Sequence, residues 1–181
     1  MFERKTVTAK GFDLLAKVSI GGTIEFTKVK TGAGKVDIAY LSAQTDVTQP
    51  MQEFAFNADA IFDGDGQVTL QVVLDNDEVA ETYECYQLGI YATDPDEGEI
   101  LHTIIQGDTP LEVPADTVLS GWTAEFNIST AFGGATTVNV VQDPAGMLTE
   151  SKADAKYLLR SEAPEWVIGE DEEGIYIMKG E

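Results

Sequence analysis

Apolar and polar side chains alternate with a period of two over most of residues 23 to 142, which is the pattern of β-strands with one buried face. In the segment TIEFTKV the alternation places Ile24, Phe26 and Lys28 on one face. Phe54 and Phe56 share a face in the segment QEFAFNA. Three further segments predict strands in the same way: QVTLQVVL, WTAEFNIST and TTVNVVQ.

The segment YECYQLGIYA predicts a central strand, because no charged residue occurs between Glu84 and Asp94 and both faces are suited to burial. A second strand, EILHTIIQ, follows after the turn DPDEG. In that turn Pro95 presets φ and Gly98 can supply a positive φ, so the order strand, turn, strand predicts a hairpin. The next segment, GDTPLEVPADTV, contains two prolines and is expected to be a long loop.

Helical spacing occurs at two places. Near residues 6 to 19, Leu14, Leu15 and Val18 fall on one side of a short helix that Gly21 and the glycine after it would end. Gly11 lowers the helical propensity of this segment. A second helix is predicted near residues 147 to 160, where either Thr149 or Ser151 can cap its start.

The last 20 residues, 162 to 181, predict a small hairpin in which the apolar runs WVI and IYIM flank the acidic turn GEDEEG. Such a hairpin is marginal alone and needs a neighbour, either the main domain or another copy of the chain. We therefore expect a mainly β fold, an antiparallel sheet or sandwich with a short N-terminal helix and a C-terminal helix plus hairpin. The expected domains are residues 1–143 and the extension 144–181.

Composition narrows the functional classes. Hydrophobic residues make up 43% of the chain, enough for a buried core, and the formal net charge is −21. This charge disfavours nucleic-acid binding and suits a soluble protein, a basic partner or cation binding. The start of the chain lacks the apolar core of a signal peptide, and no stretch of 18 apolar residues is present. We expect synthesis in the cytoplasm and no membrane insertion.

Residues with catalytic potential are scarce. The single cysteine, Cys85, excludes an internal disulfide and is expected to pack in a strand as a small apolar group. The single histidine, His102, lies in a predicted strand and is expected to be a structural residue. One His and one Cys do not make a zinc set, and the motifs GxSxG and GxGxxG are absent. We expect no catalytic residue, no bound metal, no cofactor and no enzymatic activity.

Two kinds of binding site remain as alternatives. The acidic segments FDGDGQV and LDNDE, and residues 169 to 174, invite a calcium interpretation, although Asp-Gly pairs between apolar runs favour hairpin turns. The acidic candidates are Asp63, Asp65, Asp75 and Asp77. Aromatic residues at strand spacing favour core packing, but an exposed set would suit a carbohydrate. The aromatic candidates are Tyr83, Tyr86, Tyr91, Trp122 and Phe126.

Two segments carry a family resemblance. TAKGFDLLAKVSIGGTIEFTKVKTGAGKV has a short helix ending in Ala-Lys, a glycine turn, a TxFTK strand and a Gly-x-Gly turn. YECYQLGIYATDPDEGEILHTIIQGDTPLEVPA has a Leu-Gly-aromatic-Ala strand, an Asp-Pro-Asp-x-Gly-Glu turn and a second strand. The residues that hold these places are Leu14 to Lys17, Gly21, Gly22, Thr23 to Lys28, Gly32 to Gly34, Leu88, Gly89, Tyr91, Ala92, Asp94 to Gly98, Glu99, Leu101, Gly107, Asp108 and Pro114.

In these features, residues 5 to 142 resemble the phage tail-collar fibre family, the N-terminal fibre domain of phages and prophages of Gram-positive bacteria. One departure is Gln87, where such sequences often have Glu. Another is length, since members often continue into a fibre shaft. The chain would be either a short adaptor or a fragment of a longer fibre.

The resemblance implies a structural tail protein that attaches a tail fibre to a baseplate, located in the virion and assembled in the host cytoplasm. It implies baseplate or other tail proteins as partners and favours a homo-oligomer, with a trimer preferred. The alternative is a receptor- or carbohydrate-binding β module of a tail or cell-surface assembly. A cell-wall enzyme is a further alternative, which would need a cleft that contains His102 or a pair of carboxylates.

Overall fold

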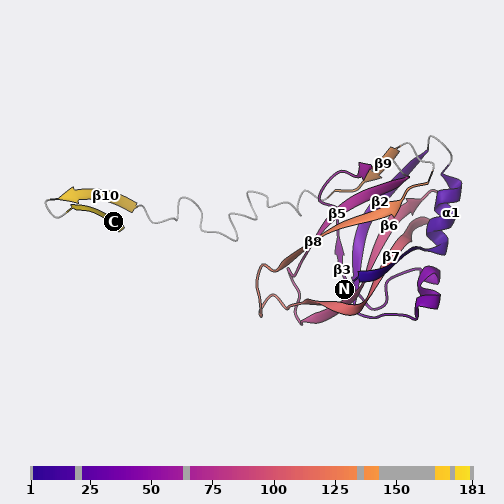
Figure 1. Ribbon diagram of the computed structural model, residues 1–181, viewed down its shortest axis with the longest axis horizontal. Coiled ribbons are helices and arrows are strands. Elements are labelled where there is room, and N and C mark those ends of the chain that lie inside the picture. Colours follow the sequence, from indigo (N-terminus) through magenta and orange to yellow (C-terminus); the bar gives the residue numbers. More distant parts are fainter. Residues whose placement is uncertain are drawn as a thin grey trace. The chain divides into compact units, whose positions relative to one another are not determined.

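The computed structural model describes residues 2–18, 22–62, 66–133, 137–142, 166–171 and 174–179 (Figure 1). The chain divides into two compact units, unit 1 (Met1–Gly146) and unit 2 (Met147–Glu181). The elements of unit 1 are β1 (Phe2–Val7), α1 (Ala9–Lys17), β2 (Thr23–Gly32), the 3₁₀ helix η1 (Ile38–Ala43), β3 (Pro50–Phe54), β4 (Ile61–Phe62), β5 (Gln67–Asp75), β6 (Tyr83–Asp94), β7 (Gly98–Val113), β8 (Thr123–Ala131) and β9 (Thr137–Val140).

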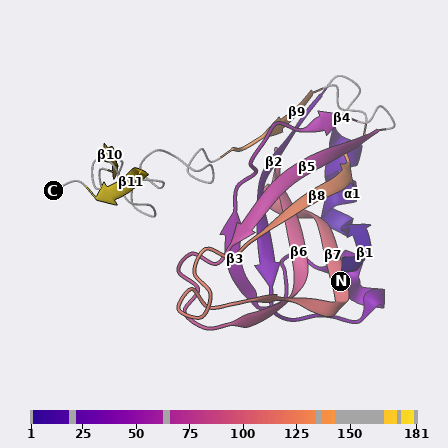
Figure 2. The same cartoon turned by 60° about the vertical axis from the view of Figure 1, so that its left-hand side comes forward.

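Unit 1 contains two sheets. The larger sheet has the strand order β1-β7-β6-β2-β3, and β9 pairs in parallel with the first half of β2. The smaller sheet has the order β4-β5-β8. Figure 2 shows β5 and β8 passing across one face of the larger sheet. The described part of unit 1 is thus mainly antiparallel β with a short N-terminal helix, as the sequence predicts.

The main core lies between the two sheets. β5 alternates as its sequence predicts, since its even-numbered residues from Val68 to Leu74 are fully buried. They join Phe26, Val29 and Ile90 of the larger sheet in one apolar cluster. The strand β6 is buried on both faces over most of its length, which confirms the prediction of a central strand.

The hairpin of β6 and β7 also follows the prediction. Asp94 pairs with Gly98 at its end, Gly98 has a φ of 80°, and the Pro95 turn connects the two strands. The loop predicted after residue 106 is wrong in part, because β7 continues to Val113. Residues 107 to 110 fall where the register with β6 shifts, so Pro110 interrupts no pair with that strand.

The N-terminal prediction needs a second correction. Thr6 and Val7 belong to a strand, β1, that pairs with β7, and the helix spans Ala9–Lys17 only. Thr8 begins the helix, because its hydroxyl accepts a hydrogen bond of 3.0 Å from the Gly11 N–H.

A third correction concerns β2. Lys28 does not share the buried face of Ile24 and Phe26, because a β-bulge at Thr27 shifts the alternation. Val29 is buried instead.

A matching bulge occurs on the other side of β6. Ile90 pairs with Thr103 and Tyr91 with Leu101, so His102 is the extra residue of β7. Tyr91 lies between Ile90 and Ala92 of the main core, so the alternation along β6 points it to the opposite face of the larger sheet. There Tyr91 joins Leu101 and Ile104 in a second apolar cluster.

Unit 2 contains an antiparallel hairpin of β10 (Trp166–Asp171) and β11 (Gly174–Lys179). Its strands confirm the pairing predicted for the two apolar runs. The helix predicted near residues 147 to 160 lies outside the described residues.

Candidate functional site

The outer face of the larger sheet is covered by residues 33–49, which we call the strap and which include η1. The strap closes on itself as a compact surface loop, because the Ala33 N–H donates to the Gln49 carbonyl (2.9 Å) and the Gly34 N–H to that of Thr48 (3.0 Å). Leu41 and Val47 of the strap pack on the second apolar cluster. Gly89 makes the close approach possible, since a Cβ there would lie 2.7 Å from Val47 Cγ1.

Buried amides hold the strap to the sheet. Gln87 on β6 accepts a hydrogen bond from the Thr48 N–H (2.7 Å) and donates from Nε2 to Gln44 Oε1 (2.9 Å) and Gln106 Oε1 (2.7 Å). Gln106 on β7 in turn accepts from the Val36 N–H (3.0 Å) and donates to the Val36 carbonyl (2.9 Å). Gln87 and Gln106 are at most 2% exposed, so each of these bonds replaces one that water would make. An amide at position 87 supplies both donor and acceptor, whereas a carboxylate would supply acceptors only.

Tyr91 adds a further anchor at Asp46 and Val47, next to Thr48, which Gln87 holds. Its hydroxyl donates to Asp46 Oδ1 and accepts from the Val47 N–H (3.3 Å). Burial, with the bond to the Asp46 carboxylate, raises the pKa of Tyr91 well above its usual range. Lys30 lies over its ring, with Nζ 4.8 Å from the centroid.

Lysines and carboxylates form a network of ion pairs beside Tyr91. Lys28 Nζ lies 2.8 Å from Glu53 and 2.9 Å from Glu99, and Lys30 lies 3.1 Å from Glu53. The bonds to Glu53 and Glu99 raise the pKa of Lys28, and the bond to Lys28 lowers that of Glu53. These charged groups therefore neutralise one another within the sheet.

The helix α1 is fixed beside the strap. The Thr8 N–H donates to the His102 carbonyl (2.9 Å), and the Thr8 hydroxyl donates to the Leu101 carbonyl. At the other end of the helix, Lys17 Nζ lies 2.9 Å from the buried carboxylate of Asp94. This bond raises the pKa of Lys17 and lowers that of Asp94.

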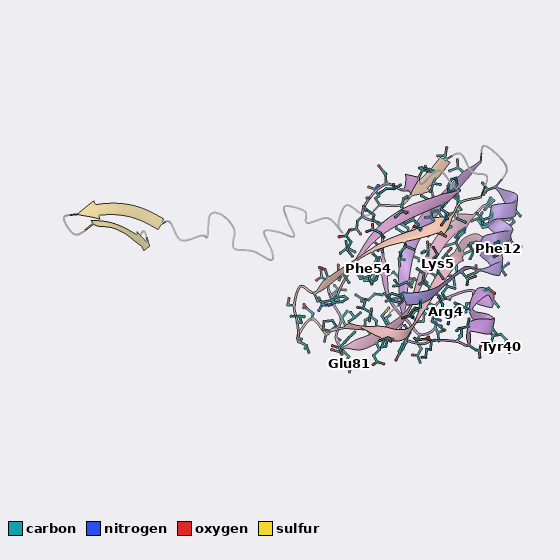
Figure 3. The ribbon with its side chains drawn as sticks, viewed as in Figure 1. Arg4, Lys5, Phe12, Tyr40, Phe54 and Glu81 are labelled. Atoms are coloured by element: carbon teal, nitrogen blue, oxygen red, sulfur yellow. The ribbon has the colours of Figure 1, made fainter. Side chains whose placement is uncertain are left out.

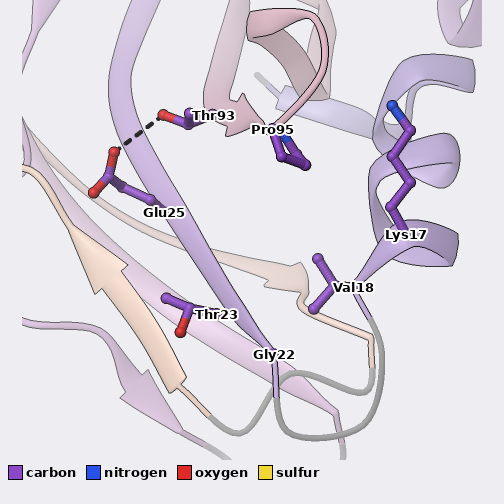
Figure 4. A pocket seen from close by; sticks show the side chains of 7 residues that line it. All are labelled: Lys17, Val18, Gly22, Thr23, Glu25, Thr93 and Pro95. Atoms are coloured by element: carbon purple, nitrogen blue, oxygen red, sulfur yellow. Dashed lines mark hydrogen bonds between the residues drawn. The ribbon is translucent and has the colours of Figure 1, made fainter.

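A pocket of about 380 Å³ lies at this end of α1 (Figure 4). It is lined by Lys17, Val18, Gly22, Thr23, Glu25, Thr93 and Pro95. The charged groups on its rim are engaged, since Thr93 donates to Glu25 Oε1 (3.1 Å) and Lys17 pairs with Asp94. The ammonium group of Lys17 is thus already paired, whereas Glu25 keeps its negative charge and is only hydrogen-bonded to the neutral Thr93 hydroxyl.

His102 is fully buried at its bulge, where its ring lies edge-on to Phe26 with the centroids 5.2 Å apart. Nδ1 lies 2.9 Å from Thr103 Oγ1, which is 2.6 Å from Thr130 Oγ1, and Nε2 has no hydrogen-bond partner among the described residues. Burial lowers the pKa of His102 to about 4, so the ring is neutral at pH 7. This position suits the structural role that the sequence predicts.

Cys85 packs in β6 as a fully buried residue, as the sequence predicts. Burial raises the pKa of its thiol to about 11, so the thiolate is scarce at neutral pH.

The acidic candidates form turns where the structure describes them. The Asp77 N–H donates to Asp75 Oδ1 (3.1 Å), which closes a local turn. The strands β4 and β5 on either side of the FDGDGQV turn pair antiparallel, as a hairpin requires, whereas Asp63 and Asp65 lie outside the described residues. Among the described residues, no group of three or more His, Cys, Asp or Glu side chains is arranged to hold a metal ion.

The five aromatic candidates do not gather on one exposed face. Tyr83 is buried and donates to Gln52 Oε1 (2.7 Å), and Tyr91 lies under the strap. Phe126 is half-buried against Phe2, with the ring centroids 5.6 Å apart. Tyr86 is half-buried beneath Lys35 Nζ, and Trp122 is half-buried against the main core.

Sequence patterns did not identify Gln44, Asp46 or Gln106, which take part in the hydrogen bonds between the strap and the sheet. The only signal for them was the close spacing of Gly32 and Gly34, which marks a tight approach of backbones: a Cβ on Gly32 would lie 2.8 Å from the Thr48 carbonyl. Pairing between a strap side chain and a strand more than 40 residues away leaves no local pattern.

Comparisons of the chain with protein-family models, with curated proteins and with solved structures found no match. No helix within the described residues is long and apolar enough to cross a membrane.

Proposed function

We propose that the protein is a non-enzymatic structural component of a phage or prophage tail that attaches a tail fibre to the baseplate. Its place is the virion, after assembly in the host cytoplasm, and its partners are baseplate or other tail proteins. Unit 1 is the attachment domain, and the chain that follows it leads toward a fibre or pairs with one. Further copies of the chain, three in the preferred arrangement, complete the assembly.

The observation that carries this proposal is how the polar side chains of unit 1 are used. Gln87, Gln106 and Tyr91 hold the strap, and the ammonium groups of Lys17 and Lys28 are paired with carboxylates. Because these polar side chains hold the fold together, they favour a rigid surface for protein contact over a reactive cleft.

The resemblance supports the same proposal at one specific place. Its most distinctive stretch, residues 83 to 106, forms a paired ribbon at the centre of the larger sheet. The glycine of the Leu-Gly-aromatic motif, Gly89, provides the space into which the strap packs.

The test is immunogold electron microscopy of particles from the strain that carries the gene. An antibody raised against the purified chain is expected to label the tail at its baseplate end, and antibody absorbed with the purified chain should label nothing. Recovery of the protein only in the particle-free soluble fraction would overturn the proposal. Turnover of purified peptidoglycan would do the same in favour of an enzyme, and binding on a glycan array without particle labelling would favour a carbohydrate-binding module.

A further inference from the structure

Three large apolar side chains project outward from α1 and η1. Phe12 is 58% exposed, Ile38 49% and Tyr40 67%. Figure 3 shows Phe12 and Tyr40 on the same side of unit 1, along which α1 and η1 follow one another in Figure 1. The exposed alanines Ala9 and Ala16 flank Phe12 along the helix. Exposed aromatic groups gathered in this way are typical of a protein contact surface.

Arg4 belongs to the same side. It pairs with Gln106 across β1 and β7, and directly paired residues of antiparallel strands project to one face. The Gln106 side chain binds Val36 of the strap, so this face is the one that the strap covers. Arg4 thus lies beside η1, and together Arg4, Phe12, Asp37, Ile38 and Tyr40 make up what we call the α1–η1 face.

Both charges of the α1–η1 face lack an ion-pair partner within the part of the chain that the structure describes. Among the described residues no ion pair involves Arg4 or Asp37, although the protein has an excess of 21 negative charges. Asp37 uses one oxygen, Oδ1, to accept a hydrogen bond from the Ala39 N–H (2.9 Å) at the start of η1. A cation and an anion that share a face without meeting make that face complementary to a second copy of itself.

The face is also preformed. The buried amides of the strap fix η1, and Thr8 fixes α1, so association would require little ordering of either element. At the edge of α1, Lys10 pairs with Glu97 at 2.6 Å. Lys10 and Glu97 therefore add little net charge at the edge of the face.

We propose that two copies of the chain pair through their α1–η1 faces, related by a two-fold axis. Phe12, Ile38 and Tyr40 form the apolar centre, and Arg4 of each copy meets Asp37 of the other. This pairing belongs to unit 1 and does not depend on the proposed role in a phage tail.

The test is sedimentation velocity of the full chain over a range of concentrations. The wild-type protein is expected to show a concentration-dependent species of twice the mass, or an even multiple of the chain mass. The double substitution Phe12→Ser with Tyr40→Ser should raise the dissociation constant about tenfold or more, because truncating central aromatic residues usually removes most of an interface's affinity. Val118→Ser is the matched control: Val118 is 73% exposed on a separate turn, and its replacement should leave the association unchanged.

Charge reversal gives a second and more specific readout. Arg4→Asp alone and Asp37→Arg alone should each weaken pairing, because each places like charges across the interface. The protein that carries both substitutions should recover most of the lost association, since the pair is restored with its signs exchanged. Circular dichroism and thermal melts establish that each variant is folded.

Four results would overturn the proposal, three of them from the variants and concentration series above and one from a deletion. The first is a wild-type chain that is monomeric at every concentration, and the second is a Phe12/Tyr40 variant that associates as strongly as the Val118 control. The third is the absence of any rescue by the double charge reversal. If deletion of residues 162–181 alone abolishes association, the contact lies in unit 2 and the pairing proposed for unit 1 is wrong, whereas tail labelling in electron microscopy would be unaffected.

Discussion

Two residues, one within the larger sheet and one packed on it, show how the surroundings of a residue decide its role. His102 is the only histidine of the chain, and at the β-bulge in β7 it lies in the interior with no charged partner among the described residues. Gly11 lowers the helical propensity of its segment, yet α1 depends on it, because the helix packs directly on the backbone of β7.

The burial of His102 predicts a pH dependence of stability. Between about pH 6.5 and pH 4 the unfolded chain binds a proton at His102 that the folded protein, with a pKa of about 4, does not. The free energy of unfolding should therefore fall by about 3 kcal/mol as the pH decreases through this window, and then level off for this group. Urea unfolding at a series of pH values measures it.

The control for this pH dependence is His102→Gln, which removes the titrating group. Its unfolding free energy should change little between pH 6.5 and pH 4.5. Asp94 and Glu53, whose pKa values are lowered by their lysine partners, lose their contribution at lower pH in both proteins. Identical pH slopes for the variant and the wild type would show that His102 is not the group responsible.

Gly11→Ala should destabilise the protein, although alanine is the better helix former. The new Cβ would lie 2.2 Å from the His102 carbonyl oxygen and 2.7 Å from Val7 Cγ1, so α1 would have to move. We expect a loss of about 2–3 kcal/mol, which exceeds the gain of about 1 kcal/mol in propensity. Thermal melts measure this, with Ala16→Gly on the exposed side of α1 as the comparison for propensity alone. A higher melting temperature for Gly11→Ala would show that the helix is not held this tightly.

At the scale of elements, the strap depends on a few buried amides. Gln87→Leu removes the acceptor of the Thr48 N–H and the donors to Gln44 and Gln106. Because buried partners left unpaired are costly, we expect a loss of about 2–3 kcal/mol and faster hydrogen exchange at the Thr48 amide.

The matched control for Gln87→Leu is Gln71→Leu, the same exchange at a half-buried position of β5. It should change stability by less than about 1 kcal/mol. Unchanged exchange at Thr48 in Gln87→Leu would mean that Gln87 does not hold the strap.

The elements that sequence patterns predicted are those whose signal is local. The residues of β5 alternate between buried and less buried positions. The turn with Pro95 and Gly98 determines the hairpin of β6 and β7 by backbone preference alone. The bulges at Thr27 and His102 could not be predicted, because each depends on the register with β6. β1 was missed for a similar reason, since its exposed residues Glu3, Arg4 and Lys5 hide the strand pattern that pairing with β7 creates.

At the scale of the whole molecule, the net charge of −21 opposes the folded state by self-repulsion. Raising the salt concentration from about 20 mM to about 500 mM screens this repulsion, because the Debye length falls well below the size of the domain. We expect the melting temperature to rise with salt. Exposed ion pairs such as Lys10–Glu97 weaken in salt, but each contributes little. A melting temperature that falls with salt would show that such pairs outweigh the repulsion.

The strand β9 is the last described element before the chain leaves unit 1, and it runs parallel to β2 from Thr137 to Val140. Four residue pairs of β9, followed by the bridge between Gln142 and Phe56, therefore join this exit to the rest of unit 1. Tension along the strand axis would act on all of them at once in shear, whereas a sideways pull would peel them apart one after another. If unit 1 is the fixed end of a mechanical tether, its connection to the rest of the chain should resist the largest force when the load acts along β9.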